Sequence, residues 1–473
     1  MARSRLPILV RILLGLFVFV LLCLAVVYGQ GRIGTAKWQR YAADLRSAGQ
    51  PLTFAEIEAL RAVVPDDRNS ARALEPLIPR IKTIDSRQVN EWVLVFGRRA
   101  GGFDFFNGIP RYALAPSRQF LDEHRDIVTG LTSLADGPTG RFDIRYEPMP
   151  FNTLLPHLTS LRAASKLLLL DAVLELTEGA MEPAGRNAEI VWSLSGTLDD
   201  EPTIISRLVQ MAIQDVGVQI LEIMLRVGEL ENDLLARLAD ALDRKRTSAT
   251  MRWALWGERA NWIETLEQLA RGHVALASLS ATQTPNMPPT GSPSMMPNML
   301  IRGEQLLGTQ MLSRLIDAGD DPAALLVAAE QFDTEVKLRL SRWHVLFRIL
   351  MPSLSRPVVL HIRSTARLDC ARAALAAEQF RLARGRLPDT LVELVPDFLS
   401  SMPVDPFSGG PLRLAVTEMG VVIYSVGEDH ADNGGDVARL PKQKQPQDVG
   451  FRLPAAEHRG ILLTSEPEPK DEE

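Results

Sequence analysis

The sequence predicts a mainly α-helical protein with an N-terminal transmembrane helix, a multi-helix α domain and a small C-terminal α+β module. Three observations lead to this prediction. An apolar run covers residues 6–28 and has the length of about 20 residues that a bilayer requires. Apolar residues recur at three- and four-residue steps through residues 204–227, as on one face of a helix. Alternating apolar residues at 412–416 and 449–453, with a β-branched apolar run at 421–426 between them, predict a sheet of three short antiparallel strands.

Length and composition are those of a folded protein of two or three domains. The chain has 473 residues, of which 46% are hydrophobic and 23% are charged. Its net charge of −6 gives no electrostatic reason to bind nucleic acid, and no nucleic-acid partner is expected. The two cysteines, Cys23 and Cys370, provide neither a disulfide framework nor a cysteine metal site.

The N-terminal apolar run is predicted to be an uncleaved membrane anchor. Its apolar stretch is longer than the roughly 7–15 residues of a signal-peptide core. Arg11 lies early in the run, where its side chain can reach the membrane interface. Cleavage after Val27-Tyr28-Gly29 is the alternative, since these residues form a tolerable processing site. Lys and Arg residues are found on both sides of the run, so the charge asymmetry that would orient it is weak.

The residues after the anchor are predicted to continue as helices. One helical face carries Trp38, Tyr41, Ala42 and Leu45. The stretch Leu52-Thr53-Phe54-Ala55-Glu56-Ile57 combines a capping box with a hydrophobic staple, so a new helix is expected there. Helical signals are strongest from Leu154 to Ser280. A second apolar stripe at Ile204, Leu208 and Met211 predicts that the helix of residues 204–227 is buried on two sides.

Three indoles in this region, Trp253, Trp256 and Trp262, are predicted to pack in the protein and not to form a binding platform.

The predicted organisation divides the chain into six parts. These are an anchor at 1–30, a helical domain at 31–282, a Pro/Met-rich loop at 283–298, a helical continuation at 299–360, a C-terminal module at 361–454 and a disordered acidic tail at 455–473.

The C-terminal module has the most distinctive pattern in the chain. A helix with many small residues is predicted to end at Gly385-Arg386-Leu387-Pro388, because glycine tolerates positive φ and proline cannot continue a helix. Thr390 and Glu393 have the spacing of a capping box. Asp405-Pro406-Phe407 begins a turn that precedes the strands. The loop after the second strand carries Asp429, Asp432, Asn433 and Asp436, hard oxygen donors of the kind that Ca²⁺ prefers.

These C-terminal motifs resemble the C-terminal domain of the major pseudopilin of type II secretion. The resemblance is carried by Gly385-Arg386-Leu387-Pro388, by Pro403-Val404-Asp405-Pro406-Phe407 and by Tyr424-Ser425-Val426-Gly427-Glu428-Asp429. It implies a calcium ion in the loop after the second strand, with the carbonyl of Val426 and the carboxylate of Asp429 as ligands. Either Asp436 or Asp448 would take the place of the family's later aspartate. The alternative is an ordinary solvated acidic loop that binds no calcium.

The resemblance does not extend to the N-terminus, because residues 1–29 contain no pseudopilin processing site and no acidic residue. Some 330 residues also separate the anchor from the module. The apolar run supplies the single span. The short N-terminal tail and the resemblance together imply a bacterial inner-membrane protein with the bulk of the chain outside the cytoplasm, and the resemblance implies partners in the cell envelope or secretion machinery.

No phosphate-binding loop, dinucleotide fingerprint, G-x-S-x-G elbow or H-E-x-x-H helix occurs in the sequence. The seven histidines are scattered, with no pair at metal-ligand spacing. The sequence therefore favours a membrane-anchored, non-enzymatic scaffold or assembly protein with a calcium-stabilised module. The alternative is an exported, membrane-tethered enzyme of hydrolase type, with its site in the helical domain.

Overall fold

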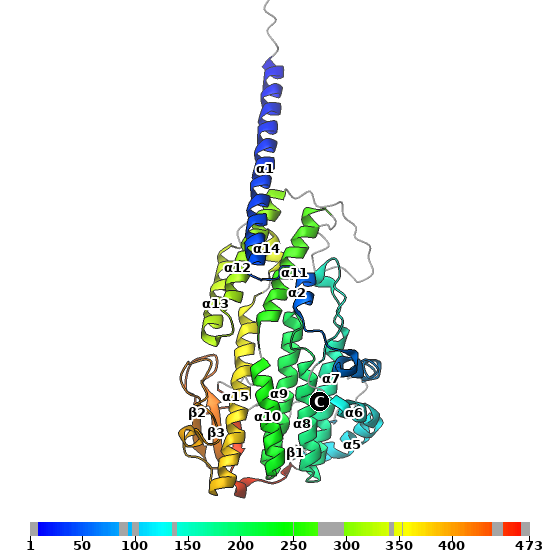
Figure 1. Ribbon diagram of the computed structural model, residues 1–473, viewed down its shortest axis with the longest axis vertical. Coiled ribbons are helices and arrows are strands. Elements are labelled where there is room, and N and C mark those ends of the chain that lie inside the picture. Colours follow the sequence, from blue (N-terminus) through cyan, green and yellow to red (C-terminus); the bar gives the residue numbers. More distant parts are fainter. Residues whose placement is uncertain are drawn as a thin grey trace, which may run out of the picture.

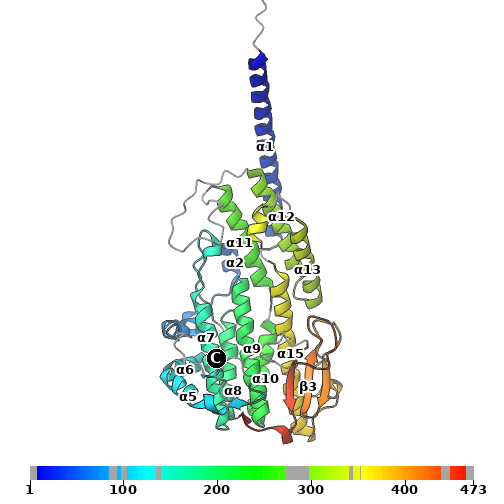
Figure 2. The ribbon, with the colours of Figure 1, turned by 180° about the vertical axis from the view of Figure 1, so that it is seen from behind.

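Helix α1 (Ile8–Ser47) projects as a single rod from a body of long helices, and a small sheet lies beside the end of that body far from the rod (Figures 1 and 2). These features come from a computed structural model of the chain. It describes residues 8–84, 93–96, 104–134, 140–248, 250–272, 298–339, 345–351, 353–437 and 448–464. The prediction of a mainly helical protein with one three-stranded antiparallel sheet is confirmed.

The bounds of the other described elements follow the chain. The helices before the central block are α2 (Phe54–Leu60), α3 (Ser70–Leu74), α4 (Ile78–Ile81), α5 (Leu114–Glu123) and α6 (Arg125–Leu131). The long helices of the body are α7 (Pro156–Thr177), α8 (Met181–Gly196), α9 (Ile204–Val227), α10 (Asn232–Ser248) and α11 (Arg252–Ala270). The later helices are α12 (Asn298–Asp317), α13 (Pro322–Arg339), α14 (Val345–Leu350) and α15 (Ser355–Arg384). The strands are β1 (Ile109–Pro110), β2 (Arg413–Thr417), β3 (Gly420–Ser425), β4 (Val449–Pro454) and β5 (Leu463–Thr464).

Helix α1 has two parts with different surroundings. Its large apolar side chains from Ile12 to Leu22 are between 46% and 63% exposed. Further along, Trp38, Ala42 and Leu45 are buried in one apolar core with residues of α12. The predicted helical face is therefore confirmed, and it attaches the rod to the body.

Helix α9 is the described helix that is long and apolar enough to cross a membrane, but 72% of its most apolar stretch is buried inside the protein. It is therefore a core helix. The predicted burial on two sides holds for its second half, where Ile220 and Met224 are fully buried. It fails at the first turn, because Ile205 is 61% exposed.

The body contains two large apolar cores. The core nearer the rod joins α1 to α11, α12, α13 and the first half of α15. The farther core joins α7, α8, α9, α10, the second half of α15 and one face of the sheet. Helix α15 contributes Ile362 and Ala366 to the nearer core, and Leu375 and Phe380 to the farther one. It therefore runs through the expected boundary at residue 361, and the module shares its apolar core with the helical body.

The sheet has the strand order β2-β3-β4, with both pairs antiparallel. Alternation along β3 sends its side chains to opposite faces. Val421 and Ile423 join the farther core beside α15, whereas Val422 and Tyr424 pack with Val437 on the outer face. The sheet is thus covered by helices on one side and by the loop of residues 427–437 on the other.

Local signals at helix starts and at one helix end are confirmed. Thr53 accepts a hydrogen bond from the backbone N–H of Glu56, and Glu56 in turn accepts one from the N–H of Leu52. The reciprocal pair at Thr390 and Glu393 starts a 3₁₀ turn at Leu391–Leu394. Gly385 ends α15 at φ of 76°, the left-handed conformation that glycine adopts without strain.

The predicted disordered tail is wrong for residues 455–464. A 3₁₀ turn forms at Ala456–His458, and β5 pairs in parallel with β1. The cause is a long-range attachment, because the Arg459 guanidinium is buried against the Glu378 carboxylate of α15. The rest of the tail lies outside the described residues. So does the Pro/Met-rich loop, except residue 298, where α12 begins.

Candidate functional site

The acidic loop after β3 lies over the outer face of the sheet. Asp432 is the residue that connects it to the strands, because its Oδ1 accepts hydrogen bonds from the Tyr424 hydroxyl at 2.9 Å and from the Gly434 N–H at 3.0 Å. Its Oδ2 lies 2.5 Å from the Arg413 guanidinium of β2. These hydrogen bonds and the ion pair hold the pKa of Asp432 below its usual value.

Asp429 closes the first turn of the loop and is exposed. Its carboxylate accepts hydrogen bonds from the Ala431 N–H and from the Asn433 side-chain amide, both at 3.0 Å. The same two contacts, the backbone one first, lower the pKa of Asp429. The adjacent His430 has φ of 55°, a left-handed conformation for a residue with a side chain.

Asp448 is fully buried at the base of the loop. Its carboxylate accepts backbone hydrogen bonds from Gly435 at 2.8 Å, from Asp436 at 3.2 Å and from Asn433 at 3.4 Å. Burial raises the pKa of Asp448, and the backbone amides oppose that effect. Asp436 itself is exposed, and its backbone carbonyl accepts a hydrogen bond from the Asp448 N–H. The structure therefore brings both alternative aspartates to the same end of the loop.

These contacts determine which oxygen atoms of the loop are open to a calcium ion. Within the part of the chain that the structure describes, no group of three or more acidic, histidine or cysteine side chains is arranged to hold a metal. Asp432 is held by Arg413 and by the Gly434 N–H, Asp448 by backbone amides, and Asp429 by the Ala431 N–H and the Asn433 amide. Asp436 is exposed. Val426 is buried and donates its N–H to Asp405. Calcium would therefore have to share Asp429 with its hydrogen-bond donors and add Asp436, or would have to displace Arg413 from Asp432.

Asp405 is the central polar residue of the module, and the sequence reasoning did not identify it. It is fully buried and accepts hydrogen bonds from the Phe407 N–H, the Ser408 hydroxyl, the Ser425 hydroxyl at 2.6 Å and the Val426 N–H. The first two contacts belong to the Asp-Pro-Phe-Ser turn, a local pattern that points to them. The other two join that turn to the end of β3, twenty residues later.

The indoles of α11 have two kinds of surroundings. Trp262 is buried, donates its Nε1–H to the Gln305 carbonyl at 3.2 Å and packs edge-on against Phe347. Trp253 and Trp256 are half-buried and pack against each other with ring centroids 5.3 Å apart. The predicted packing role is confirmed for Trp262.

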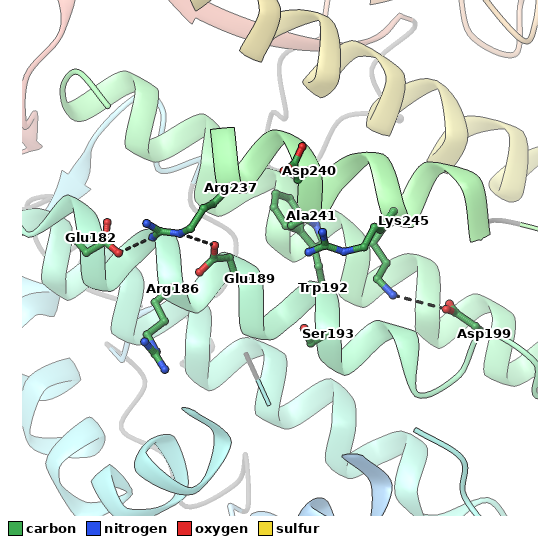
Figure 3. Close-up of a pocket in the computed structure, with 11 residues that line it drawn as sticks. Glu182, Arg186, Glu189, Trp192, Ser193, Asp199, Arg237, Asp240, Ala241 and Lys245 are labelled. Carbon is green, nitrogen blue, oxygen red and sulfur yellow. Dashed lines mark hydrogen bonds and ion pairs between the residues drawn. The ribbon is translucent and has the colours of Figure 1, made fainter. Parts of the chain in front are cut away.

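A charged groove of about 820 Å³ lies between α8 and α10 (Figure 3). Arg237 of α10 bridges to Glu182 and Glu189 of α8, and Lys245 lies 3.6 Å from Asp199 at the other end. Acidic and basic side chains alternate across the groove, so its charges are mostly neutralised by each other. The sequence reasoning did not predict this groove.

A second pocket, the seam pocket, lies where α9, α15 and the start of β4 meet. It has a volume of about 440 Å³. It is lined by Leu208, Met211, Ala212, Asp215, Val218, Leu360, Arg363, Ser364, Arg367, Leu368, Val437, Asp448, Val449 and Gly450. One of the expected metal ligands, Asp448, therefore lies in its wall. No signal in the sequence pointed to this pocket, because its three walls are far apart along the chain.

A buried cluster in the body places a histidine, a glutamate and a serine in contact. Glu201 lies between the other two, with Oε1 at 2.8 Å from His157 Nε2 and Oε2 accepting the Ser206 hydroxyl at 2.6 Å. A nucleophilic serine requires the imidazole beside its hydroxyl and the carboxylate behind the imidazole. In this cluster the order is different, and all three side chains are buried, so it is a structural contact.

Comparisons of the chain with known proteins found no relative. The resemblance to the pseudopilin module therefore rests on the C-terminal motifs alone. No protein-family model, no curated protein and no solved structure matches the chain.

Proposed function

We propose that the protein is a membrane-anchored, non-enzymatic scaffold or assembly protein of the bacterial inner membrane. A single span holds the bulk of the chain outside the cytoplasm. The observation that supports this proposal is the exposed apolar part of α1, which projects from the body and is continuous with the helix that docks on α12 (Figure 1).

The energetic reason for the anchor is the apolar surface of this rod. Ten large apolar side chains between Ile12 and Leu22 are each at least 46% exposed. Removing such surface from water stabilises by about 25 cal/mol per Å². A bilayer supplies that environment for the length of a helix whose backbone hydrogen bonds are all internal. The anchor prediction therefore explains an exposure that would be costly in water.

The continuity of α1 makes the attachment of the body to the membrane stiff. The helix passes without a break from the apolar part to Trp38, Ala42 and Leu45, which are buried in the body. A scaffold that holds partners at a fixed distance from a membrane requires such a connection. The orientation with the short N-terminal tail in the cytoplasm comes from the pseudopilin resemblance, as does the proposal of partners in the envelope or secretion machinery.

The test of the anchor uses the full chain expressed in a bacterium. The protein is expected to stay with membranes in alkaline carbonate, and protease added to spheroplasts is expected to digest the body. A variant that lacks residues 1–30 is expected to be soluble and still helical by circular dichroism. A mature N-terminus at Gln30, or a body protected from protease in intact spheroplasts, would refute the anchor or its orientation respectively.

We also propose that calcium binds the acidic loop through Asp429 and Asp436, together with the Val426 carbonyl. Extracellular calcium modules have Kd values of about 10⁻⁴–10⁻³ M. At 1 mM Ca²⁺ and these Kd values, an ion that binds only the folded form adds about 0.4–1.4 kcal/mol of stability. The full chain is therefore expected to melt at a higher temperature in millimolar Ca²⁺ than in chelator, and Asp429→Ala is expected to remove most of that difference.

The matched control for this measurement is Glu418→Ala, in the exposed turn between β2 and β3. It removes one carboxylate from the same module without touching the loop. Identical melting curves in calcium and chelator would refute the calcium proposal. An equal loss of the calcium effect in both variants would show a general charge effect and no specific site.

The alternative function is an exported, membrane-tethered enzyme of hydrolase type. The groove between α8 and α10 is the observation that favours it, because it places several charged side chains around one open space. Hydrolytic activity that is lost in Lys245→Met, with the helical content unchanged, would favour the enzyme over the scaffold.

A further inference from the structure

We propose that the seam pocket binds the alkyl chain of an uncharged, single-chain amphiphile such as a monoacylglycerol. The inference is independent of the proposed scaffold function and of the membrane anchor. It is based on the size of the pocket, on its walls and on the charges at its base.

The pocket has the size and position of a ligand site. Its volume of about 440 Å³ lies within the range of about 300–1,000 Å³ that is usual for small-molecule sites. Its walls come from α9, from α15 and from Val437 and residues 448–450, which are far apart along the chain. The pocket is open to solvent, since Ala212 in its lining is exposed.

Most of the lining side chains are apolar. They are Leu208, Met211, Ala212 and Val218 of α9, Leu360 and Leu368 of α15, and Val437 and Val449 beside the sheet. The apolar surface continues outward along α9, because Ile205 is 61% exposed and lies three residues before Leu208, on the same helical face. A flexible hydrocarbon chain can fill the pocket and lie along this strip.

The charged groups that line the pocket interact with other protein groups, and the Arg363 guanidinium lies 4.0 Å from Glu428. The Arg367 guanidinium donates to Asp215 at 2.9 Å, to Glu222 at 3.2 Å and to the Gly450 carbonyl. Asp448 accepts three backbone N–H groups. A charged ligand would have to lose water without gaining a new partner at these residues, and that desolvation is costly. An uncharged head with hydroxyl groups avoids this cost, and the Ser364 hydroxyl is in the lining.

The edge of β4 that faces the pocket does not offer a place for a partner strand. The carbonyl of Gly450 accepts a hydrogen bond from Arg367, the N–H of Arg452 donates to Glu222 at 3.1 Å, and the carbonyl of Val449 accepts from the Cys370 thiol at 3.5 Å. A peptide that adds to a sheet requires such backbone groups to be open. The pocket therefore fits an alkyl chain better than an extended peptide.

The test is native mass spectrometry of the full chain, held in an amphipathic polymer. The probes are three amphiphiles with the same twelve-carbon chain: 1-monolauroylglycerol, dodecanoate and dodecyltrimethylammonium. A saturable one-to-one adduct is expected for the uncharged probe, with at least tenfold weaker binding of the two charged probes. Equal binding of all three, or unsaturable binding, would overturn the proposal.

Two matched variants locate the adduct. Ala212→Trp places an indole in the pocket from an exposed position on α9, and it is expected to reduce binding of 1-monolauroylglycerol at least tenfold. Ala323→Trp adds the same side chain at an exposed position on α13 and is expected to leave binding unchanged. Melting temperatures of both variants show whether they fold. If Ala212→Trp folds and binds as well as the unsubstituted protein, the amphiphile lies elsewhere.

Discussion

Replacement of Arg459 by methionine is expected to loosen the C-terminal segment and to destabilise the protein by about 3 kcal/mol. The side chain of Arg459 is 3% exposed and that of Glu378 is fully buried. Two parallel hydrogen bonds join them, at 2.6 and 2.7 Å. The guanidinium also donates to the carbonyls of Pro454 and Gly228. Methionine is similar in length but supplies none of these donors.

The magnitude follows from what remains around the carboxylate. Removing one partner of a buried ion pair costs about 3–5 kcal/mol, because the other charge stays buried. Glu378 keeps Arg381, which donates to it at 2.9 and 3.0 Å, so the lower end of that range applies. Although burial by itself raises the pKa of Glu378, hydrogen bonds from Arg459 and Arg381 hold it below its usual value.

The assay is urea unfolding of the full chain, followed by circular dichroism, for Arg459→Met, Glu378→Leu and the double variant. The double variant is expected to lose less free energy of unfolding than the two single variants lose together, because it leaves no buried charge from this pair. The control is Arg386→Met, which breaks an exposed pair with Glu393 and is expected to cost less than about 1 kcal/mol. A loss from Arg459→Met no larger than that of the control would refute the reasoning.

Two further predictions concern α11. Gly257→Ala is expected to destabilise by at least about 1–3 kcal/mol, because its methyl group would lie 1.7 Å from the Pro202 carbonyl oxygen. Gly303→Ala, with no atom within 4 Å, is the control and is expected to stabilise by about 0.5–1 kcal/mol. Burial raises the pKa of Glu258 from 4.5 to about 7, so the folded state binds its proton more tightly. As the pH rises from about 4.5 to 7, the free energy of unfolding therefore falls by at most about 3 kcal/mol. In Glu258→Gln, the free energy of unfolding measured in urea is expected to change less with pH over this range. Unchanged stability of Gly257→Ala, or an unchanged pH profile of Glu258→Gln, would contradict these predictions.

The sequence by itself determined the structural features that depend on interactions between residues close together in the chain. The helix cap at Thr53, the capping box at Thr390 and the helix end at Gly385 were predictable, because each depends on hydrogen bonds or φ angles inside one turn. The three strands were predictable for the same reason, since alternation at 412–416 and 449–453 and the β-branched run at 421–426 are local properties.

Only the tertiary structure decided how these elements meet. The ordered tail depends on Arg459 and Glu378, which are 81 residues apart, and the module's polar centre depends on Asp405 and Ser425. The seam pocket joins α9 to residues more than 200 positions later. Helical periodicity states that a face is apolar, but not whether protein, lipid or solvent covers it, as the exposed Ile205 on a core helix shows. What covers an apolar face is determined by packing between segments that are far apart along the chain, and the local sequence of one segment does not identify the other.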